Sequence, residues 1–191
     1  IFEASKKPLA KLIISGGGRC NVTNYTFDPK LLVKNYPRGN KELLGAFYKF
    51  NAQDTVNWFE EHGVPLKVEP DNRMFPTTDN SHTVERALKE ATKSLDIELV
   101  LDAKIKSIVK SKEDNFFILT MFSGESVKVK NVILATGSSQ SGYEIATSLG
   151  HTIEKTVPSL FTFEIQDQRI EELSGVSLQH VETKLIVEGG K

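Results

Sequence analysis

Hydrophobic residues recur at helical spacing between residues 28 and 63. The apolar positions fall three and four residues apart, which is typical of amphipathic helices: Leu31, Leu32, Leu43, Leu44, Phe47 and Phe50. Gly39-Asn40 separates two short helices in this stretch. Asn51, with Asp54 three residues later, is expected to cap a third helix, and Gly63 is expected to end it.

A second apolar stripe predicts a longer helix that Ser81 caps. The stripe consists of Val84, Leu88, Ala91 and Leu95. The pattern then changes to short β-type runs at residues 97–101, 105–109, 116–122 and 127–129. These runs predict a strand of a parallel sheet followed by a three-stranded antiparallel meander, where a doubly wound fold would have helices.

Three further segments complete the pattern. Residues 70–72, Pro-Asp-Asn, lie between apolar residues and predict a tight hairpin. Residues 131–134 predict a short buried strand, which runs into the small-residue turn Ala135-Thr136-Gly137 and then into a helix that ends near Leu149. Residues 157–163 alternate between apolar and polar positions, as a strand does.

The most specific stretch is residues 15–24, which read S-G-G-G-R-C-N-V-T-N. Three consecutive glycines are tolerated where the main chain turns sharply or lies against a ligand. Arg19 adds hydrogen-bond donors suited to phosphate or carboxylate. On composition alone, a plain turn explains the three glycines equally well. A P-loop is disfavoured because no Lys follows the glycines. Cys20 would be a low-pKa nucleophile only beside a cation, which Arg19 could supply, or at a helix N-terminus.

Composition excludes several classes of function. A net charge of -1 over 191 residues gives no electrostatic case for nucleic acid or an anionic membrane. The single Cys excludes a disulfide framework, and the four His residues lack metal-ligand spacing, so no metal site is expected. There is no secretory signal or membrane-spanning pattern, which favours the cytoplasm or an organelle interior.

The decapeptide resembles the SGGGRCNxTN signature of the BaiN-like flavoproteins, also called the YhiN or aminoacetone-oxidase type. The resemblance implies a glutathione-reductase-like FAD/NAD(P)-binding domain of the α/β class, with a parallel sheet plus a three-stranded meander. Glu3 would accept hydrogen bonds from ribose hydroxyls. The other implied cofactor-binding residues are Ser15, Gly16, Gly17, Gly18, Arg19, Cys20, Asn21, Val22, Thr23, Ile105, Ala135, Thr136 and Gly137. The similar E-x-x-x-R-x-F-P run of that family implies that Arg73 helps to order the cofactor loop or meets substrate; the alternative is a structural ion pair with Glu69.

The same resemblance implies a domain organisation and a function. Residues 1–156 would form the FAD-binding domain, without its first strand and G-x-G-x-x-G helix, and residues 157–191 would begin an inserted β-rich domain. The whole protein would be an FAD-dependent oxidoreductase that passes electrons between NAD(P)H, flavin and a small organic substrate or oxygen. The alternative is a non-catalytic flavin- or nucleotide-binding protein. We expect these 191 residues alone to bind FAD weakly or not at all, and to associate with themselves through unpaired strand edges.

Overall fold

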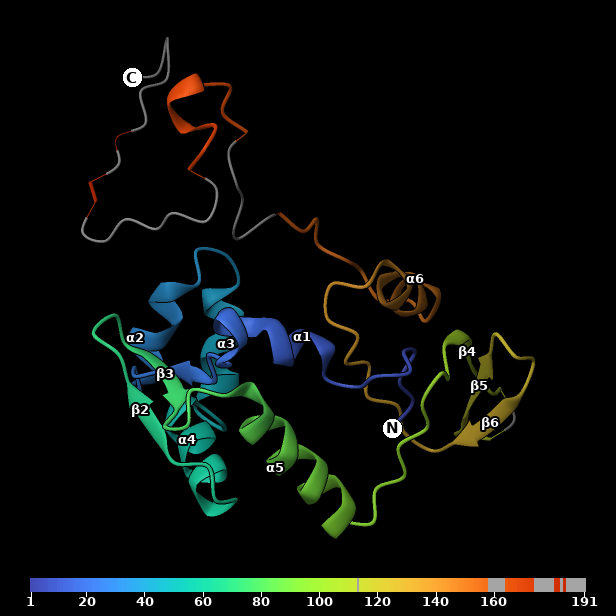
Figure 1. Cartoon of the computed structure of the whole chain (residues 1–191). Helices are drawn as coiled ribbons and strands as arrows, with labels where there is room; N and C mark the ends of the chain where they lie inside the picture. Colours follow the sequence, from blue (N-terminus) through green and yellow to red (C-terminus); the bar gives the residue numbers. More distant parts are fainter. Residues whose placement is uncertain (113, 158–163, 174–180, 183, 185–191) are drawn as a thin grey trace. The chain divides into compact units, whose positions relative to one another are not determined.

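The computed structural model describes residues 1–112, 114–157, 164–173, 181–182 and 184 (Figure 1). Contacts divide the chain into two units, Ile1–Ile153 and Glu154–Lys191. In the second unit, the described residues contain the 3₁₀ turn η3, Gln168–Ile170, which the Asp167 carboxylate caps by accepting from the Arg169 N–H at 3.0 Å. The strand expected over residues 157–163 lies outside the described residues from residue 158 onward, and so does most of the expected β-rich segment, residues 157–191.

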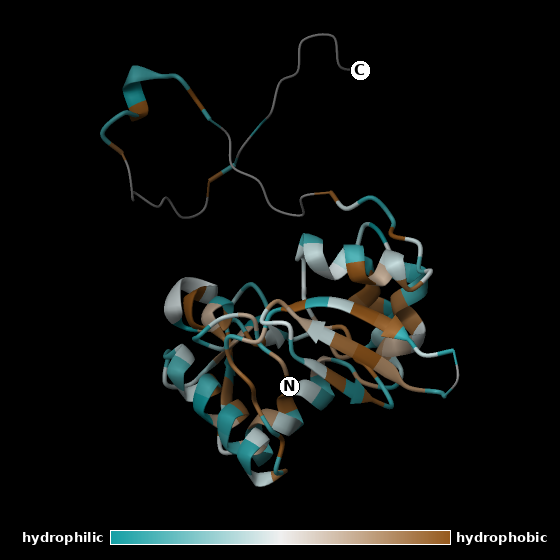
Figure 2. Cartoon of the chain, turned by 90° about the vertical axis from the view of Figure 1, so that its right-hand side faces the viewer, coloured by the Kyte–Doolittle hydropathy of each residue, from teal (hydrophilic) through white to brown (hydrophobic). Residues whose placement is uncertain are grey.

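Short helices dominate the first part of the first unit. They are α1 (Ala10–Ile14), η1 (Ser15–Gly18), α2 (Pro29–Leu32), η2 (Val33–Asn35), α3 (Asn40–Phe47) and α4 (Ala52–Glu61). The predicted cap of α4 is confirmed, because Asn51 accepts from the Gln53 N–H at 2.7 Å while Asp54 accepts from the Asn51 N–H. Figure 2 shows hydrophilic and hydrophobic bands alternating along the helices, as expected where one face is buried.

A small antiparallel sheet lies beside these helices. It has the order β1-β3-β2, with β1 at Thr23–Asn24, β2 at Leu66–Val68 and β3 at Arg73–Pro76. The predicted hairpin is confirmed, and Asn72 takes the left-handed φ of 65° in its turn. Phe75 of β3 is fully buried. Leu66 of β2 packs against the first hydrophobic core, which consists of Cys20, Phe59, Val64, Val84 and Ala87.

Helix α5, Ser81–Ser94, covers this core. Val84, Ala87 and Ala91 are buried on its inner face. The predicted cap is wrong by one residue, because the Asn80 side chain accepts from the His82 N–H at 2.9 Å. Ser81 instead lies inside the fold, and its hydroxyl donates to the Ile13 carbonyl at 2.9 Å. Leu95, at the end of the predicted stripe, is 70% exposed because the helix ends at Ser94.

The predicted meander consists of β4 (Ile105–Lys110), β5 (Phe117–Met121) and β6 (Ser126–Val129), paired antiparallel in that order. Helix α6, Gln140–Ser148, packs against it. Ile108, Leu119 and Ile145 form the centre of this second core, and Phe2 and Val132 pack at its margin. The N-terminal segment is thereby attached to the meander.

The expected parallel sheet is reduced to one pairing in the described residues. Phe2 and Val100 form a parallel bridge, in which the Glu3 N–H donates to the Val100 carbonyl at 2.9 Å. The prediction of a buried strand at residues 131–134 is wrong, since this segment forms no strand and Ile133 is 92% exposed. A strand needs the donors and acceptors of a neighbour, and no described segment pairs with Ile133 or Leu134.

Candidate functional site

The glycine loop, which we define as residues 15–20, turns through the left-handed region. Gly16, Gly17 and Gly18 have φ values of 57°, 69° and 83°, and Cys20 has 64°. The Cys20 N–H closes the loop by donating to the Ser15 carbonyl at 3.0 Å. A Cβ on Gly16 would lie 2.8 Å from both the Asn21 nitrogen and Cε1 of Phe75, so only glycine fits there.

The outer part of the loop is open. A Cβ on Gly17 or Gly18 would meet no other described atom within 4 Å. The loop therefore presents one face to Phe75 at Gly16 and leaves the main chain accessible at the next two glycines. This is the kind of main-chain exposure that allows a ligand to approach the backbone closely.

Arg19 is held against the hairpin by carboxylates. It forms an ion pair with Glu69, and its Nη1 lies 3.5 Å from Oδ1 of Asp79. Its guanidinium carbon is 4.0 Å from the centroid of the Phe75 ring, within cation–π range. The hydrogen bond to Glu69 is the main cause that raises the pKa of Arg19 above its ordinary value. The guanidinium is thus engaged by protein groups.

Arg73 is likewise paired within the hairpin. Its Nε donates to Asp71 at 2.6 Å, and its Nη2 lies 3.6 Å from Oε2 of Glu69. The structure therefore contains the ion pair between Arg73 and Glu69 that was the alternative to a cofactor or substrate contact. A backbone hydrogen bond from Arg73 is the largest cause that lowers the pKa of Asp71.

Cys20 is not an activated thiol. Its side chain is 5% exposed, and burial raises its pKa more than a hydrogen bond with Ser15 lowers it. The condition under which Cys20 would be a low-pKa nucleophile is therefore not met, even though Arg19 is its neighbour in sequence. Burial in the first core dominates because the Arg19 guanidinium faces the hairpin carboxylates.

The remaining residues of the signature are incorporated into the sheet. The Val22 N–H donates to the Met74 carbonyl at 2.8 Å, and Thr23 pairs with Met74 in β1–β3. The side-chain hydroxyl of Ser15 donates to the Leu12 carbonyl at 2.8 Å. The signature thus connects α1, the glycine loop and the hairpin.

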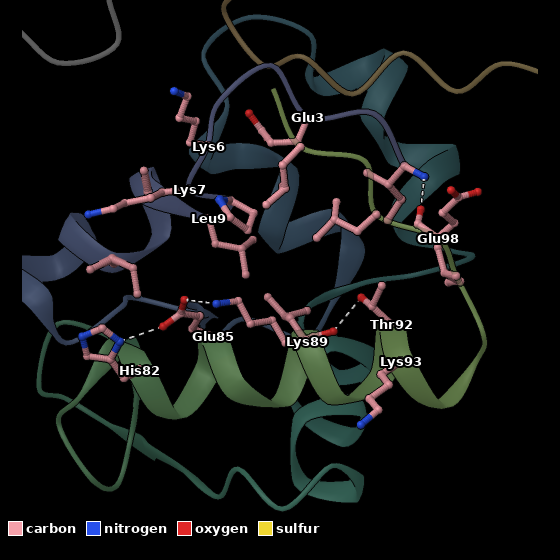
Figure 3. Close-up of a pocket in the computed structure, with 18 of the residues that line it drawn as sticks. Glu3, Lys6, Lys7, Leu9, His82, Glu85, Lys89, Thr92, Lys93 and Glu98 are labelled. Atoms are coloured by element: carbon pink, nitrogen blue, oxygen red, sulfur yellow. Dashed lines mark hydrogen bonds and ion pairs between the residues drawn. The ribbon is translucent and has the colours of Figure 1, made fainter. Parts of the chain in front are cut away.

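A cavity of about 1550 Å³ lies between residues 1–14 and α5 (Figure 3). Glu3, Lys6 and Lys7 line it on one side, and His82, Glu85 and Lys89 line it on α5. The Glu3 carboxylate is oriented by the Ser5 N–H, which donates to Oε1 at 2.8 Å. Hydrogen bonds from Lys89 and His82 are the main causes that lower the pKa of Glu85.

The structure brings only part of the predicted site to this cavity. Ile13 and Ile14, just before the glycine loop, line the wall with Glu3. Among the described residues, the cavity lining does not include residues 15–23, Ile105 or 135–137. Ile105 begins β4 and packs at the margin of the second core, and Ala135, Thr136 and Gly137 are exposed.

The α5 side of the cavity was missed as a site from the sequence. His82, Glu85 and Lys89 have i, i+3 and i+4 spacing, which places them on one face of a helix. That spacing indicates a shared polar face of a helix but does not reveal the cavity, since residues 1–14 also line it. In the described part of the chain, no group of His, Cys, Asp and Glu side chains is arranged to hold a metal ion. No helix there has the length and apolar character to cross a membrane.

An acidic residue directly after a parallel backbone pairing, as Glu3 follows the Phe2–Val100 bridge, is a feature of Rossmann-type nucleotide-binding domains. Residues 1–189 match the family model described as HI0933-like protein Rossmann domain. The chain belongs to this family, which lies within the FAD-dependent oxidoreductase superfamily.

Three curated relatives are similar to the chain at low identity. The ribosomal RNA dihydrouridine synthase of Escherichia coli is 26% identical over 100% of this chain and 48% of its own length. The corresponding synthase of Haemophilus influenzae is 25% identical over 93% and 46%. The 3-dehydro-bile acid delta(4,6)-reductase of Clostridium scindens is 24% identical over 92% and 43%. The chain therefore spans about half the length of the curated relatives that it matches.

Proposed function

We propose that the whole protein is a BaiN-like, FAD-dependent oxidoreductase that uses NADH or NADPH to reduce a carbon–carbon double bond in an organic substrate. FAD, when bound, supplies the two-electron chemistry, and the protein supplies binding and orientation. We also propose that the protein works in the cytoplasm or an organelle interior. Residues 1–156 would be the flavin domain, and residues 157–191 the start of an inserted domain.

The observation that carries this proposal is the position of Glu3. Its carboxylate follows the Phe2–Val100 parallel pairing and lies on a large cavity together with Lys6 and Lys7. The Ser5 N–H fixes Oε1, and Oε2 is available to accept a hydrogen bond from a ribose hydroxyl. The ammonium groups of Lys6 and Lys7 are suited to phosphate oxygens. The residues present therefore fit the ribose and phosphate groups of the ADP half of FAD.

Other residues are proposed as contacts on a weaker basis. The open glycines of residues 16–18 allow close approach of a ligand to the main chain. Ile105 and residues 135–137 remain candidates because of the family resemblance, and 135–137 are exposed. Arg19 and Cys20 are the signature residues whose surroundings favour a structural role.

The substrate class comes from what the relatives' names have in common. A dihydrouridine synthase and a delta(4,6)-reductase both convert a double bond to a single bond. We therefore propose a small molecule with a double bond conjugated to a carbonyl group, because a net charge of -1 over these 191 residues gives no electrostatic case for nucleic acid. Reduction adds a hydride and a proton across the double bond, and the nicotinamide is oxidised.

The test is turnover by the purified whole protein under anaerobic conditions. NADPH or NADH is supplied with a 3-oxo-4,6-diene steroid in one reaction and with unmodified ribosomal RNA in another. A steroid product that gains two hydrogen atoms by mass spectrometry supports the proposal. If only the RNA were reduced, the proposed reduction of a double bond would stand, but the proposal of a small-molecule substrate would be overturned. Bound flavin that no nicotinamide reduces would favour the non-catalytic alternative, and nicotinamide oxidation with oxygen only would indicate an oxidase.

A further inference from the structure

We infer that Arg19, Glu69 and Phe75 form a clamp that fixes the course of the glycine loop, and that Arg19 is a positioning residue, not a phosphate ligand. We call these three residues the loop clamp. The inference rests on the proposed function only for the identity of the ligand that the loop meets. It departs from the expectation that Arg19 binds the cofactor directly.

The first part of the clamp is aromatic. Phe75 is fully buried in β3, and its ring edge occupies the space that a side chain at position 16 would need. The same ring lies 4.0 Å from the Arg19 guanidinium. Phe75 therefore contacts the start of the loop and supports the residue at its end.

The second part is electrostatic. Glu69 lies in the turn of the hairpin, where its N–H donates to the Arg73 carbonyl at 2.8 Å. Its carboxylate pairs with Arg19, and the exposed fractions of the two side chains are 23% and 33%. Partial burial limits solvent screening of the pair. Asp79 adds a second carboxylate near the guanidinium, at 3.5 Å.

These contacts restrain a loop that has intrinsic freedom. Glycines lose more conformational entropy on ordering than any other residue, and three follow one another here. At Gly17 and Gly18 even an added Cβ would meet no other described atom within 4 Å, so no neighbouring group restrains this part of the loop. The loop is therefore ordered from its ends, and the clamp provides the connection at Gly16 and Arg19.

Cys20 offers a direct readout of loop opening. It is the single Cys of the chain, it directly follows Arg19, and it is 5% exposed. A thiol reagent reacts with it only when the segment opens, so the labelling rate reports the opening equilibrium when closing is fast. The measurement needs no flavin, and mass spectrometry of the labelled peptide reports the reaction of Cys20 within the whole protein.

The experiment compares Cys20 labelling in wild type, Arg19→Gln, Arg19→Lys, Glu69→Gln and the Arg19→Gln/Glu69→Gln double variant. Lys128→Gln is the matched control, because Lys128 also combines an ion pair, with Asp114, and a ring contact, with Phe116 at 4.6 Å, but in the meander. Losing the Arg19 contacts should raise the labelling rate about tenfold.

The clamp predicts a specific order of rates. Arg19→Lys keeps the charge but not the planar group and labels at an intermediate rate. Because both changes remove the Arg19–Glu69 pair, their effects on the labelling rate are less than additive in the double variant, and Lys128→Gln labels like wild type. The clamp would be overturned if Cys20 in Arg19→Gln were labelled at the wild-type rate, or if Lys128→Gln raised the labelling rate as much as Arg19→Gln does. Absence of FAD binding by the whole protein would instead overturn the proposed function and leave the labelling result unaffected.

Discussion

At the scale of single residues, glycine is needed at positions 16 and 17 of the signature for different physical reasons. Gly16 is required by two conditions: a left-handed φ of 57°, and the lack of space for a Cβ, which would lie 2.8 Å from atoms of Phe75 and Asn21. Gly17 meets only the first condition, with a φ of 69° and open space around it. The sequence alone does not distinguish them, because it contains no information on which glycine faces the core.

The distinction predicts unequal costs for alanine. Gly17→Ala should lower the free energy of unfolding by about 1 kcal/mol, the strain of a left-handed non-glycine residue. Gly16→Ala should lose about 1–3 kcal/mol more, because its Cβ overlaps buried atoms. Urea unfolding of both variants measures the difference. Equal losses would show that Phe75 does not restrict position 16.

Cys20 predicts a pH dependence of stability. Its pKa is raised by burial in the folded state, whereas in the unfolded chain it is about 8.5. The unfolded state therefore releases this proton first as the pH rises, so its contribution is complete below about pH 8.5 and is lost above it. Comparing unfolding free energies of wild type and Cys20→Ala from pH 7 to 10 checks this. The decline should be shallower in Cys20→Ala, and parallel curves would contradict the assignment.

At the scale of elements, local patterns were sufficient wherever the partner lies nearby in sequence. The cap at Asn51, the hairpin at residues 70–72 and the runs that became β4, β5 and β6 all depend on neighbours within a few residues or in the next strand. The strand expected at residues 131–134 depends on a distant partner, and none of the described segments provides one. Arg19 and Glu69 are 50 positions apart in the sequence, so a local pattern could not predict their ion pair either.

The start of α5 gives a prediction for an element. Asn80→Ala removes the cap that accepts from the His82 N–H, and should cost about 1 kcal/mol of stability. Ser81→Ala leaves the cap in place but deprives the Ile13 carbonyl of its buried donor, which should cost about 1–3 kcal/mol. Thermal unfolding of the two variants distinguishes these roles. A loss confined to Asn80→Ala would mean that Ser81 does not stabilise the contact between α5 and α1.

At the scale of the whole molecule, the sequence was sufficient to predict the broad fold class, but it was not sufficient to predict which residues line the cavity. The family match over residues 1–189 is to a Rossmann domain, which agrees with the predicted α/β class. The order S-G-G-G-R-C-N does not tell which side chains face inward, so Arg19 and Cys20 could not be assigned to structural contacts from sequence. The cavity depends on the approach of residues 1–14 to α5, which only the fold determines.

The most direct test of the central claim is the visible absorption spectrum of the purified whole protein during anaerobic addition of NADPH, repeated with NADH. The account predicts bound FAD whose oxidised flavin bands disappear on reduction. It also predicts weaker FAD retention in Glu3→Gln, since the neutral amide accepts a weaker hydrogen bond from the ribose than the carboxylate does. A protein that binds no flavin when FAD is supplied, or whose flavin neither nicotinamide reduces, would contradict the account.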